Sequence, residues 1–170
     1  MGRYEDRIDL AGEYKWNDLI QVILLILFLA VWVIDSFFLR YSTSLSRYVP
    51  IYIRIPLGTL FILFSGYLAK KGLDVVFGKV REAPSVIREG IFMRLRHPVY
   101  LGAILLYFGF VILTLSVAAA ILFVFICVYY HLTARYEEKL LIKKFDVDYK
   151  NYIKKIPMWV PWLVRSEKKR

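Results

Sequence analysis

Long apolar runs separated by short polar segments dominate the pattern of this 170-residue chain. The first run, 19–39, consists almost entirely of Ile, Leu, Val, Phe and Trp. It is long enough to cross a hydrocarbon core of roughly 30 Å as a helix. The second run, 51–68, is shorter and contains Pro56, Gly58 and Gly66. We predict a transmembrane helix over each run, with close helix contacts at the glycines of the second.

The third apolar run is too long for one straight helix across a membrane. Residues 99–132 would form a helix ~51 Å long, whereas the hydrocarbon core measures roughly 30 Å. The only polar interruption is the Thr-Leu-Ser segment at 114–116. We therefore predict a tight turn there, between a third span at 98–114 and a fourth span at 117–134.

The fourth helix is predicted to continue into water over 135–145, because Leu140, Leu141 and Phe145 recur there at helical spacing among lysines. This part would lie on the membrane surface. The predicted fold class is all-α, an integral membrane helical bundle with four transmembrane helices and a C-terminal interfacial amphipathic helix. The whole chain, 1–170, is expected to be a single membrane domain.

Composition supports a membrane protein, since 59% hydrophobic residues, 17% aromatic residues and a mean hydropathy of +0.52 exceed the values of soluble domains. The formal net charge of +10 comes from tails and one internal segment, as expected for charges that hydrocarbon excludes. No folded basic domain is visible to read bases, so we expect anionic membrane lipids, and no nucleic acid, as partners of this charge. Trp159 and Trp162 fit an anchor at head-group depth.

The distribution of Lys and Arg predicts the orientation. The segment 70–96 and the C-terminal tail are rich in bases, whereas the turn 40–50 carries only Arg40 and Arg47. Four spans with both termini in the cytoplasm satisfy the positive-inside rule. The mixed charges before the first span lack the basic start of a cleaved signal, so we expect this span to remain in the mature protein.

Two charged residues lie within the first two predicted spans, close to the turn that joins them. Asp35 ends the first span and Arg54 begins the second, at similar depth. Because charges inside a bilayer normally find partners, we hypothesise a structural ion pair between them. The single cysteine, Cys127, excludes an intramolecular disulfide and a zinc cluster built on thiolates, and no metal site is expected.

Two polar clusters flank the third apolar run. They are Arg96-His97-Pro98 at its start and Glu137-Glu138 beyond its end. A helical hairpin would return both glutamates to the membrane side that His97 occupies, and would make one composite site from distant residues. The alternatives are an ordinary helix start, since proline is favoured at the first helical position, and a surface salt bridge between Arg135 and Glu138.

Short motifs follow one another through the C-terminal half of the chain. They are Val86-Ile87-Arg88-Glu89-Gly90-Ile91-Phe92, Arg96-His97-Pro98-Val99-Tyr100-Leu101-Gly102, Glu137-Glu138 with Leu141 and Phe145, and Tyr149, Tyr152 and Pro157. Their order and spacing over about 84–161 resemble the isoprenylcysteine carboxyl methyltransferase and phospholipid methyltransferase family. The first two spans match only as generic membrane helices.

The resemblance implies an S-adenosylmethionine site at the cytoplasmic ends of the last helices. The implied cofactor-binding residues are Pro84, Ser85, Val86, Ile87, Phe92, His97, Pro98, Val99, Tyr100 and Glu137. The predicted catalytic residues are Arg135, which would steer an anionic acceptor, and Glu138, which with His97 is a candidate base for an amine acceptor.

The chain departs from the family pattern at three positions. Phe92 stands where the family commonly has tyrosine, and Asp146 replaces the glycine usual after the Phe. Thr133 stands where prenylcysteine methyltransferases carry a substrate-facing arginine, with His131 and Arg135 nearby but shifted. The cofactor assignment is therefore less affected by these departures than the acceptor assignment is.

The predicted function is methyl transfer from S-adenosylmethionine to a lipid-like or prenylated acceptor, with a prenylcysteine-type carboxylate as first choice. One alternative is a phospholipid or small-amine N-methyltransferase. A second alternative, from a different class, is a non-catalytic membrane scaffold whose motifs only cap helices.

Overall fold

The computed structural model describes residues 17–78 and 85–160, and these residues form helices without strands. The helices are α1 (Asn17–Val33), η1 (Ile34–Leu39), η2 (Ser44–Arg47), α2 (Ile51–Phe77), η3 (Gly90–Met93), α3 (Pro98–Thr114) and α4 (Val117–Lys155). By length and composition, α1 with its π-helical extension η1, α2 and α4 can each cross a membrane, and α3 is a shorter apolar helix of 17 residues. The predicted all-α membrane bundle is confirmed.

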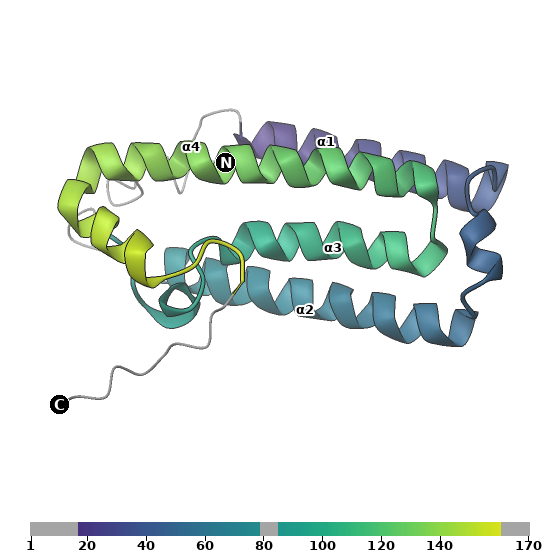
Figure 1. Cartoon of the computed structure of the whole chain (residues 1–170), viewed down its shortest axis with the longest axis horizontal. Coiled ribbons are helices and arrows are strands. Elements are labelled where there is room, and N and C mark those ends of the chain that lie inside the picture. The colour runs from purple at the N-terminus through teal and green to yellow at the C-terminus, as the bar shows by residue number, and fades with distance from the viewer. Residues whose placement is uncertain (1–16, 79–84, 161–170) are drawn as a thin grey trace.

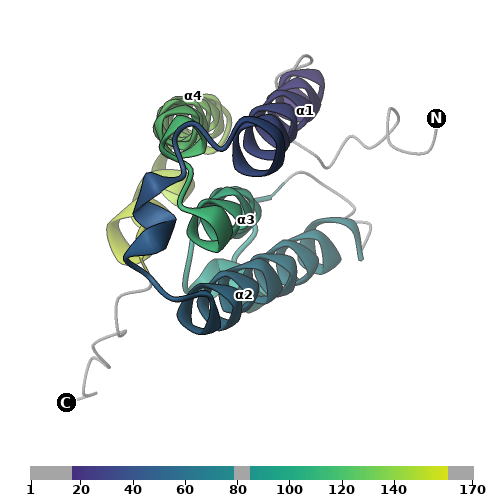
Figure 2. The same cartoon turned by 90° about the vertical axis from the view of Figure 1, so that its right-hand side faces the viewer.

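The apolar helix α3 lies between the other three long helices (Figure 2). Its partner on one side is α2, while α1 and α4 run alongside each other on the opposite side (Figures 1 and 2). Glycines allow α2 and α3 to approach closely. A Cβ atom on Gly109 would lie 2.9 Å from the carbonyl oxygen of Gly58, and one on Gly102 would lie 3.0 Å from that of Ser65. Neither position has room for a side chain.

Aromatic side chains fill the interface between α3 and the α1–α4 pair. Phe28 of α1 and Tyr107 of α3 meet edge to face, with ring centroids 4.8 Å apart. Trp32 Nε1 donates a hydrogen bond to the carbonyl oxygen of Phe110 at 2.8 Å. Phe28 and Ile126 of α4 are completely buried, so this layer is the hydrophobic core of the bundle.

The turn predicted at 114–116 is confirmed. It passes through Leu115 in a left-handed conformation, with a φ of 53°. The Ser116 hydroxyl then caps α4 by accepting a hydrogen bond from the Ala119 amide at 3.1 Å. The helix that contains the second predicted span, 51–68, is longer than that span, because α2 continues to Phe77. Lysine favours helix almost as well as leucine does, so the charged residues end the apolar run without ending the helix.

The hypothesis of an ion pair between Asp35 and Arg54 is wrong, because each group has neutral partners. Both the Ser42 and the Ser116 hydroxyls donate to the Asp35 carboxylate at 2.5 Å. Arg54 Nη1 donates to the carbonyl oxygen of Leu113 at 2.8 Å. This carbonyl lies in the last turn of α3, where carbonyl groups lack partners within the helix, so the guanidinium satisfies it.

The fourth helix continues beyond the predicted span, as expected, and then bends at Asp146, where φ is 38° and ψ is −108°. The remaining turns, 147–155, point back toward α2 and η3 (Figure 1). The family pattern has glycine here, which adopts a positive φ without strain, whereas aspartate does so at a cost. The bend brings Tyr152 to η3, where its hydroxyl donates to the Phe92 carbonyl oxygen at 2.6 Å.

Two glycines test the close packing of α2 on α3. Gly109→Ala would place Cβ against the α2 backbone, and we expect it to destabilise the protein by about 1–3 kcal/mol. Gly66→Ala is the matched control, since its Cβ would meet nothing within 4 Å, and it should leave stability unchanged or raise it. Thermal unfolding in detergent measures both. Equal tolerance of the two substitutions would contradict close helix packing at Gly109.

Candidate functional site

Two elements meet at the end of the bundle where η3 lies: the start of α3 and the middle of α4. His97 precedes Pro98, the first residue of α3. His97 Nε2 lies 3.1 Å from Oε1 of Glu138, and His97 Nδ1 lies 3.9 Å from Oε2 of Glu137. The structure therefore brings together two polar clusters that are about 40 residues apart in the chain.

Arg96 completes this cluster, although it is absent from the predicted site residues. Its Nη1 donates to Oε1 of Glu138, and both side chains are only 10% exposed. The Arg96 Nε is buried and has no hydrogen-bond partner among the described residues. The alternative of a surface salt bridge between Arg135 and Glu138 is wrong, because Glu138 faces inward and Arg135 is exposed. The signal for Arg96 was its place directly before His97 in the motif.

Tyr100, one turn into α3, connects the cluster to α1. Its hydroxyl donates to Oε1 of Glu137, and its ring lies parallel to that of His97 with centroids 5.7 Å apart. Asn17, in the first turn of α1, donates from Nδ2 to the Tyr100 hydroxyl at 2.9 Å and accepts from the Tyr129 hydroxyl at 2.8 Å. Sequence reasoning missed Asn17, because it precedes the apolar run and belongs to no motif.

The segment after α4 folds over the cluster. The Arg96 amide donates to the carbonyl oxygen of Pro157 at 3.1 Å. The Trp159 ring lies 6.0 Å from the His97 ring between centroids, and its Nε1 donates to Nδ1 of His131 at 3.2 Å. Trp159, predicted as an interfacial anchor, is therefore packed against the site.

The remaining predicted site residues lie before α3 and in its first turn. They are Ser85, Val86, Ile87 and Phe92 in the segment around η3, and Pro98 and Val99 in α3. Pro98 and Val99 face Gly72 of α2, where a Cβ atom would lie 3.3 and 2.6 Å from their side chains. Helix packing thus holds these two residues. The predicted site residue Pro84 and the predicted anchor Trp162 lie outside the described residues.

Two buried tyrosines after the bend in α4 border the cluster. Burial raises the pKa of Tyr149 above its usual range, and the negative charge of Glu138 raises it further. Burial also raises the pKa of Tyr152, against the opposing effect of Arg96. Both phenols therefore stay protonated at neutral pH, and the Tyr152 hydroxyl donates to the Phe92 carbonyl oxygen.

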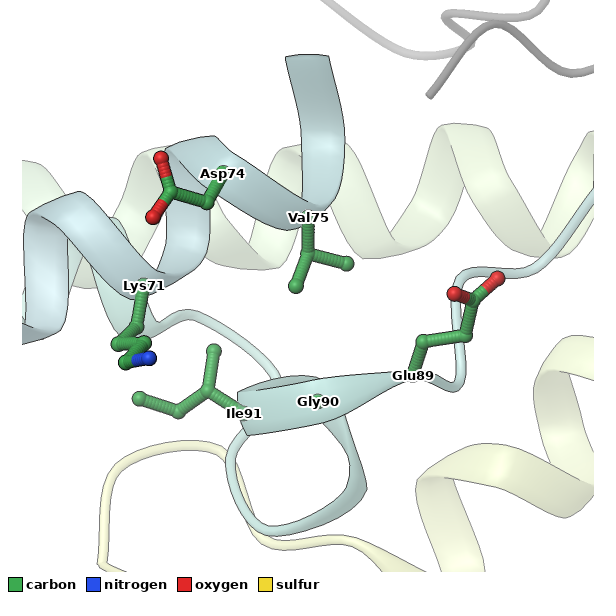
Figure 3. Close-up of a pocket in the computed structure, with 6 residues that line it drawn as sticks. All are labelled: Lys71, Asp74, Val75, Glu89, Gly90 and Ile91. Carbon is green, nitrogen blue, oxygen red and sulfur yellow. The ribbon is translucent and has the colours of Figure 1, made fainter. Parts of the chain in front are cut away.

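A recess of about 310 Å³ opens between α2 and η3, close to this end of the bundle (Figure 3). It is lined by Lys71, Asp74, Val75, Glu89, Gly90 and Ile91. Small-molecule sites usually measure ~300–1,000 Å³, so the recess is at the lower limit. It shares no residue with the cluster around His97, and none of its lining residues is among the predicted site residues.

Fold and site thus define a class of protein: an all-helical membrane bundle with a buried cluster of arginine, histidine and glutamate at one end. The chain matches the phospholipid methyltransferase family over residues 53–148, and it belongs to this family of integral membrane methyltransferases. The match includes His97, Tyr100 and both glutamates but excludes α1. No curated protein and no solved structure gives a significant match.

Burial of the Arg96–Glu138 pair leads to a test. Glu138→Gln would leave the buried guanidinium without a counter-charge, and we expect a loss of roughly 3 kcal/mol of stability. Asp148→Asn is the control, because its carboxylate pairs with Arg88 at 3.5 Å but is 75% exposed, and it should cost less than about 1 kcal/mol. Thermal unfolding compares them, and equal shifts would contradict the importance of the buried pair.

Proposed function

We propose that this protein transfers a methyl group from S-adenosylmethionine to a lipid-borne acceptor at the membrane surface. The observation that carries the proposal is the convergence of Arg96, His97, Tyr100 and the two glutamates within the part of the chain that matches the family. A purely structural cluster would need no unpaired donor, whereas the Nε of Arg96 is buried without a partner among the described residues.

The chemistry of the cluster fits the methionyl end of the methyl donor, which bears one ammonium and one carboxylate. Glu137 Oε2 and His97 Nδ1 are 3.9 Å apart, close enough for one ammonium group to donate to both. Arg96 Nε is a donor that a carboxylate would satisfy through a charge-assisted hydrogen bond. We therefore assign Glu137 and His97 to the ammonium and Arg96 to the carboxylate.

When bound, S-adenosylmethionine supplies an activated methyl group on its sulfonium. The residues of this chain then have to hold donor and acceptor in line and to keep water out. The rings of Tyr100 and Trp159 both lie close to the His97 ring and shelter the cluster. The segment 85–87 with Phe92 is assigned to the nucleoside end, as the family resemblance implies.

An amine head group is the acceptor that the charges favour. Glu137 is assigned to the donor ammonium and Arg96 to the donor carboxylate, so Glu138 is the remaining charged group of the cluster, and it attracts a cationic acceptor. An amine must lose a proton before it attacks. Both contacts of Glu138 use Oε1, which leaves Oε2 without a hydrogen bond among the described residues and available as the proton acceptor.

One observation favours a prenylcysteine-type carboxylate as a second candidate acceptor. Arg135 is exposed on α4, two residues before Glu137, and has no ion pair among the described residues. A free guanidinium at this position would steer an anionic acceptor toward the site. Such an acceptor needs no base, so Glu138 would then serve only to hold Arg96 and His97.

The proposed site faces the cytoplasm, with both termini on that side. The bases of the segment 70–96 support this orientation, because Lys and Arg accumulate on the cytoplasmic side. The same bases would bind anionic lipid head groups. The polar methyl donor would arrive from water, and the lipid-tailed acceptor would enter between helices from the bilayer.

Binding of two nucleosides to the detergent-purified chain tests the donor site. S-adenosylhomocysteine retains the ammonium and the carboxylate, whereas 5′-methylthioadenosine lacks both. We expect Glu137→Gln to weaken the former about 10- to 100-fold, because it removes a charged hydrogen-bond acceptor, and to leave the latter unchanged. Isothermal titration calorimetry measures both affinities, with Asp148→Asn as the control that should change neither.

Two results would contradict this assignment. If Glu137→Gln weakened the binding of both nucleosides equally, the donor ammonium would not lie beside Glu137. A wild-type chain that binds neither nucleoside would favour a non-catalytic membrane scaffold instead.

Transfer of a labelled methyl group distinguishes the acceptors. We expect product with phosphatidylethanolamine in mixed micelles, and little or none with a prenylcysteine analogue. Glu138→Ala would strongly reduce the transfer, because the assigned proton acceptor is removed, while Arg135→Ala would leave it unchanged. Methylation of the analogue alone, with a KM that Arg135→Ala raises about tenfold, would instead establish the carboxylate acceptor.

A further inference from the structure

We infer that Asn17, in the first turn of α1, is a positioning residue of the methyl-donor site that acts on Glu137 through Tyr100. The inference rests on the proposed function of Glu137 in binding the donor ammonium. It extends the site to a helix that lies outside the family match at 53–148.

Four side chains form one chain of hydrogen bonds across three helices. The Tyr129 hydroxyl of α4 donates to Oδ1 of Asn17 at 2.8 Å. The Nδ2 of Asn17 donates to the Tyr100 hydroxyl at 2.9 Å, and this hydroxyl donates to Oε1 of Glu137. Every proton in the chain therefore points toward the carboxylate.

The direction of the chain follows from what each group can donate. The amide of Asn17 has distinct ends, and the hydroxyl of Tyr129 occupies its oxygen, so the NH₂ end faces Tyr100. A phenol has only one proton. Since Tyr100 already accepts from Asn17, its own proton is directed to Glu137. Hydrogen bonds aligned in this way polarise one another and favour the ionised carboxylate.

The burial of Asn17 shows that its contacts are specific. Only 5% of the residue is exposed, and burying an amide without partners is unfavourable. Gln21, one turn further along α1, offers a comparison. Its oxygen accepts from the Tyr130 hydroxyl at 3.4 Å, a long contact to a neutral phenol of the core. Asn17 alone of these two amides is linked to a carboxylate of the cluster.

The consequence is that α1 helps to hold the donor site. Glu137 is fixed on α4, yet the Oε1 that does not face His97 is held by Tyr100 of α3. Asn17 in turn fixes the Tyr100 hydroxyl. A displacement of α1 would break the hydrogen bond from Asn17 to the Tyr100 hydroxyl. The Tyr100 proton would then no longer be directed to Glu137, and Glu137 would lose its orientation toward the donor ammonium.

Two leucine substitutions on α1 test the inference. Asn17→Leu keeps the branched shape of the side chain but removes both hydrogen bonds, and we expect the affinity for S-adenosylhomocysteine to fall about tenfold. Gln21→Leu is the matched control on the same helix and should change this affinity less than about twofold. Should Asn17→Leu fail to fold, Asn17→Asp keeps the shape and the acceptor for Tyr129 but offers no donor to Tyr100, and we expect a comparable loss.

A double-mutant cycle separates positioning from general support of the fold. If Asn17 acts through Tyr100, Asn17→Leu will weaken binding no further in a Tyr100→Phe background, whereas independent effects would add. Additive losses, or equal losses for Asn17→Leu and Gln21→Leu, would overturn the inference. If the wild-type chain binds S-adenosylhomocysteine and Asn17→Leu leaves the affinity unchanged, this inference fails but the proposed function stands. If the wild-type chain does not bind S-adenosylhomocysteine, the proposed function fails and this inference fails with it.

Discussion

The ion pair between Arg96 and Glu138 joins the segment before α3 to the middle of α4, with both side chains almost withdrawn from water. Neither charge is tolerable there without the other, so the pair determines how α4 passes the start of α3. His97 bonds to the same carboxylate oxygen. The neighbouring Glu137 consequently falls opposite Tyr100, and the polar cluster is assembled around one fixed contact.

The bundle supports this contact with two kinds of helix packing. Backbone contacts at glycines hold α2 against α3, and an aromatic layer separates α3 from the α1–α4 pair. At the end of that layer the apolar rings give way to the hydroxyls of Tyr100 and Tyr129 and the amide of Asn17. The polar cluster therefore begins where the hydrophobic core ends, and each of α1, α3 and α4 contributes to it.

The four helices and the meeting of His97 with the glutamates were predictable, because helix rise and membrane thickness constrain length. From the turn at Ser116, His97 is ~28 Å and Glu138 ~33 Å away along the two helices, so a hairpin brings them to similar depth. Rotation about each helix axis has no such constraint. Sequence patterns indicate the depth of a residue in the membrane, but they do not indicate which polar group its side chain contacts. The hypothesis of an Asp35–Arg54 ion pair was wrong for this reason. The contact of Trp159 with the site was missed for the same reason, whereas Asn17 was missed because it precedes the apolar run and belongs to no motif.

The reversal at Asp146 returns the chain to the start of α3, where Pro157 bonds to the Arg96 amide and Trp159 packs near His97. Synthesis proceeds from the N-terminus, so these residues are added only after α1, α2, α3 and α4 have been made. A chain that ended at Lys155 would thus contain every residue of the polar cluster but lack the segment that covers it. The order of residues along the chain therefore makes the covering of the polar cluster later than the synthesis of the helices that build it.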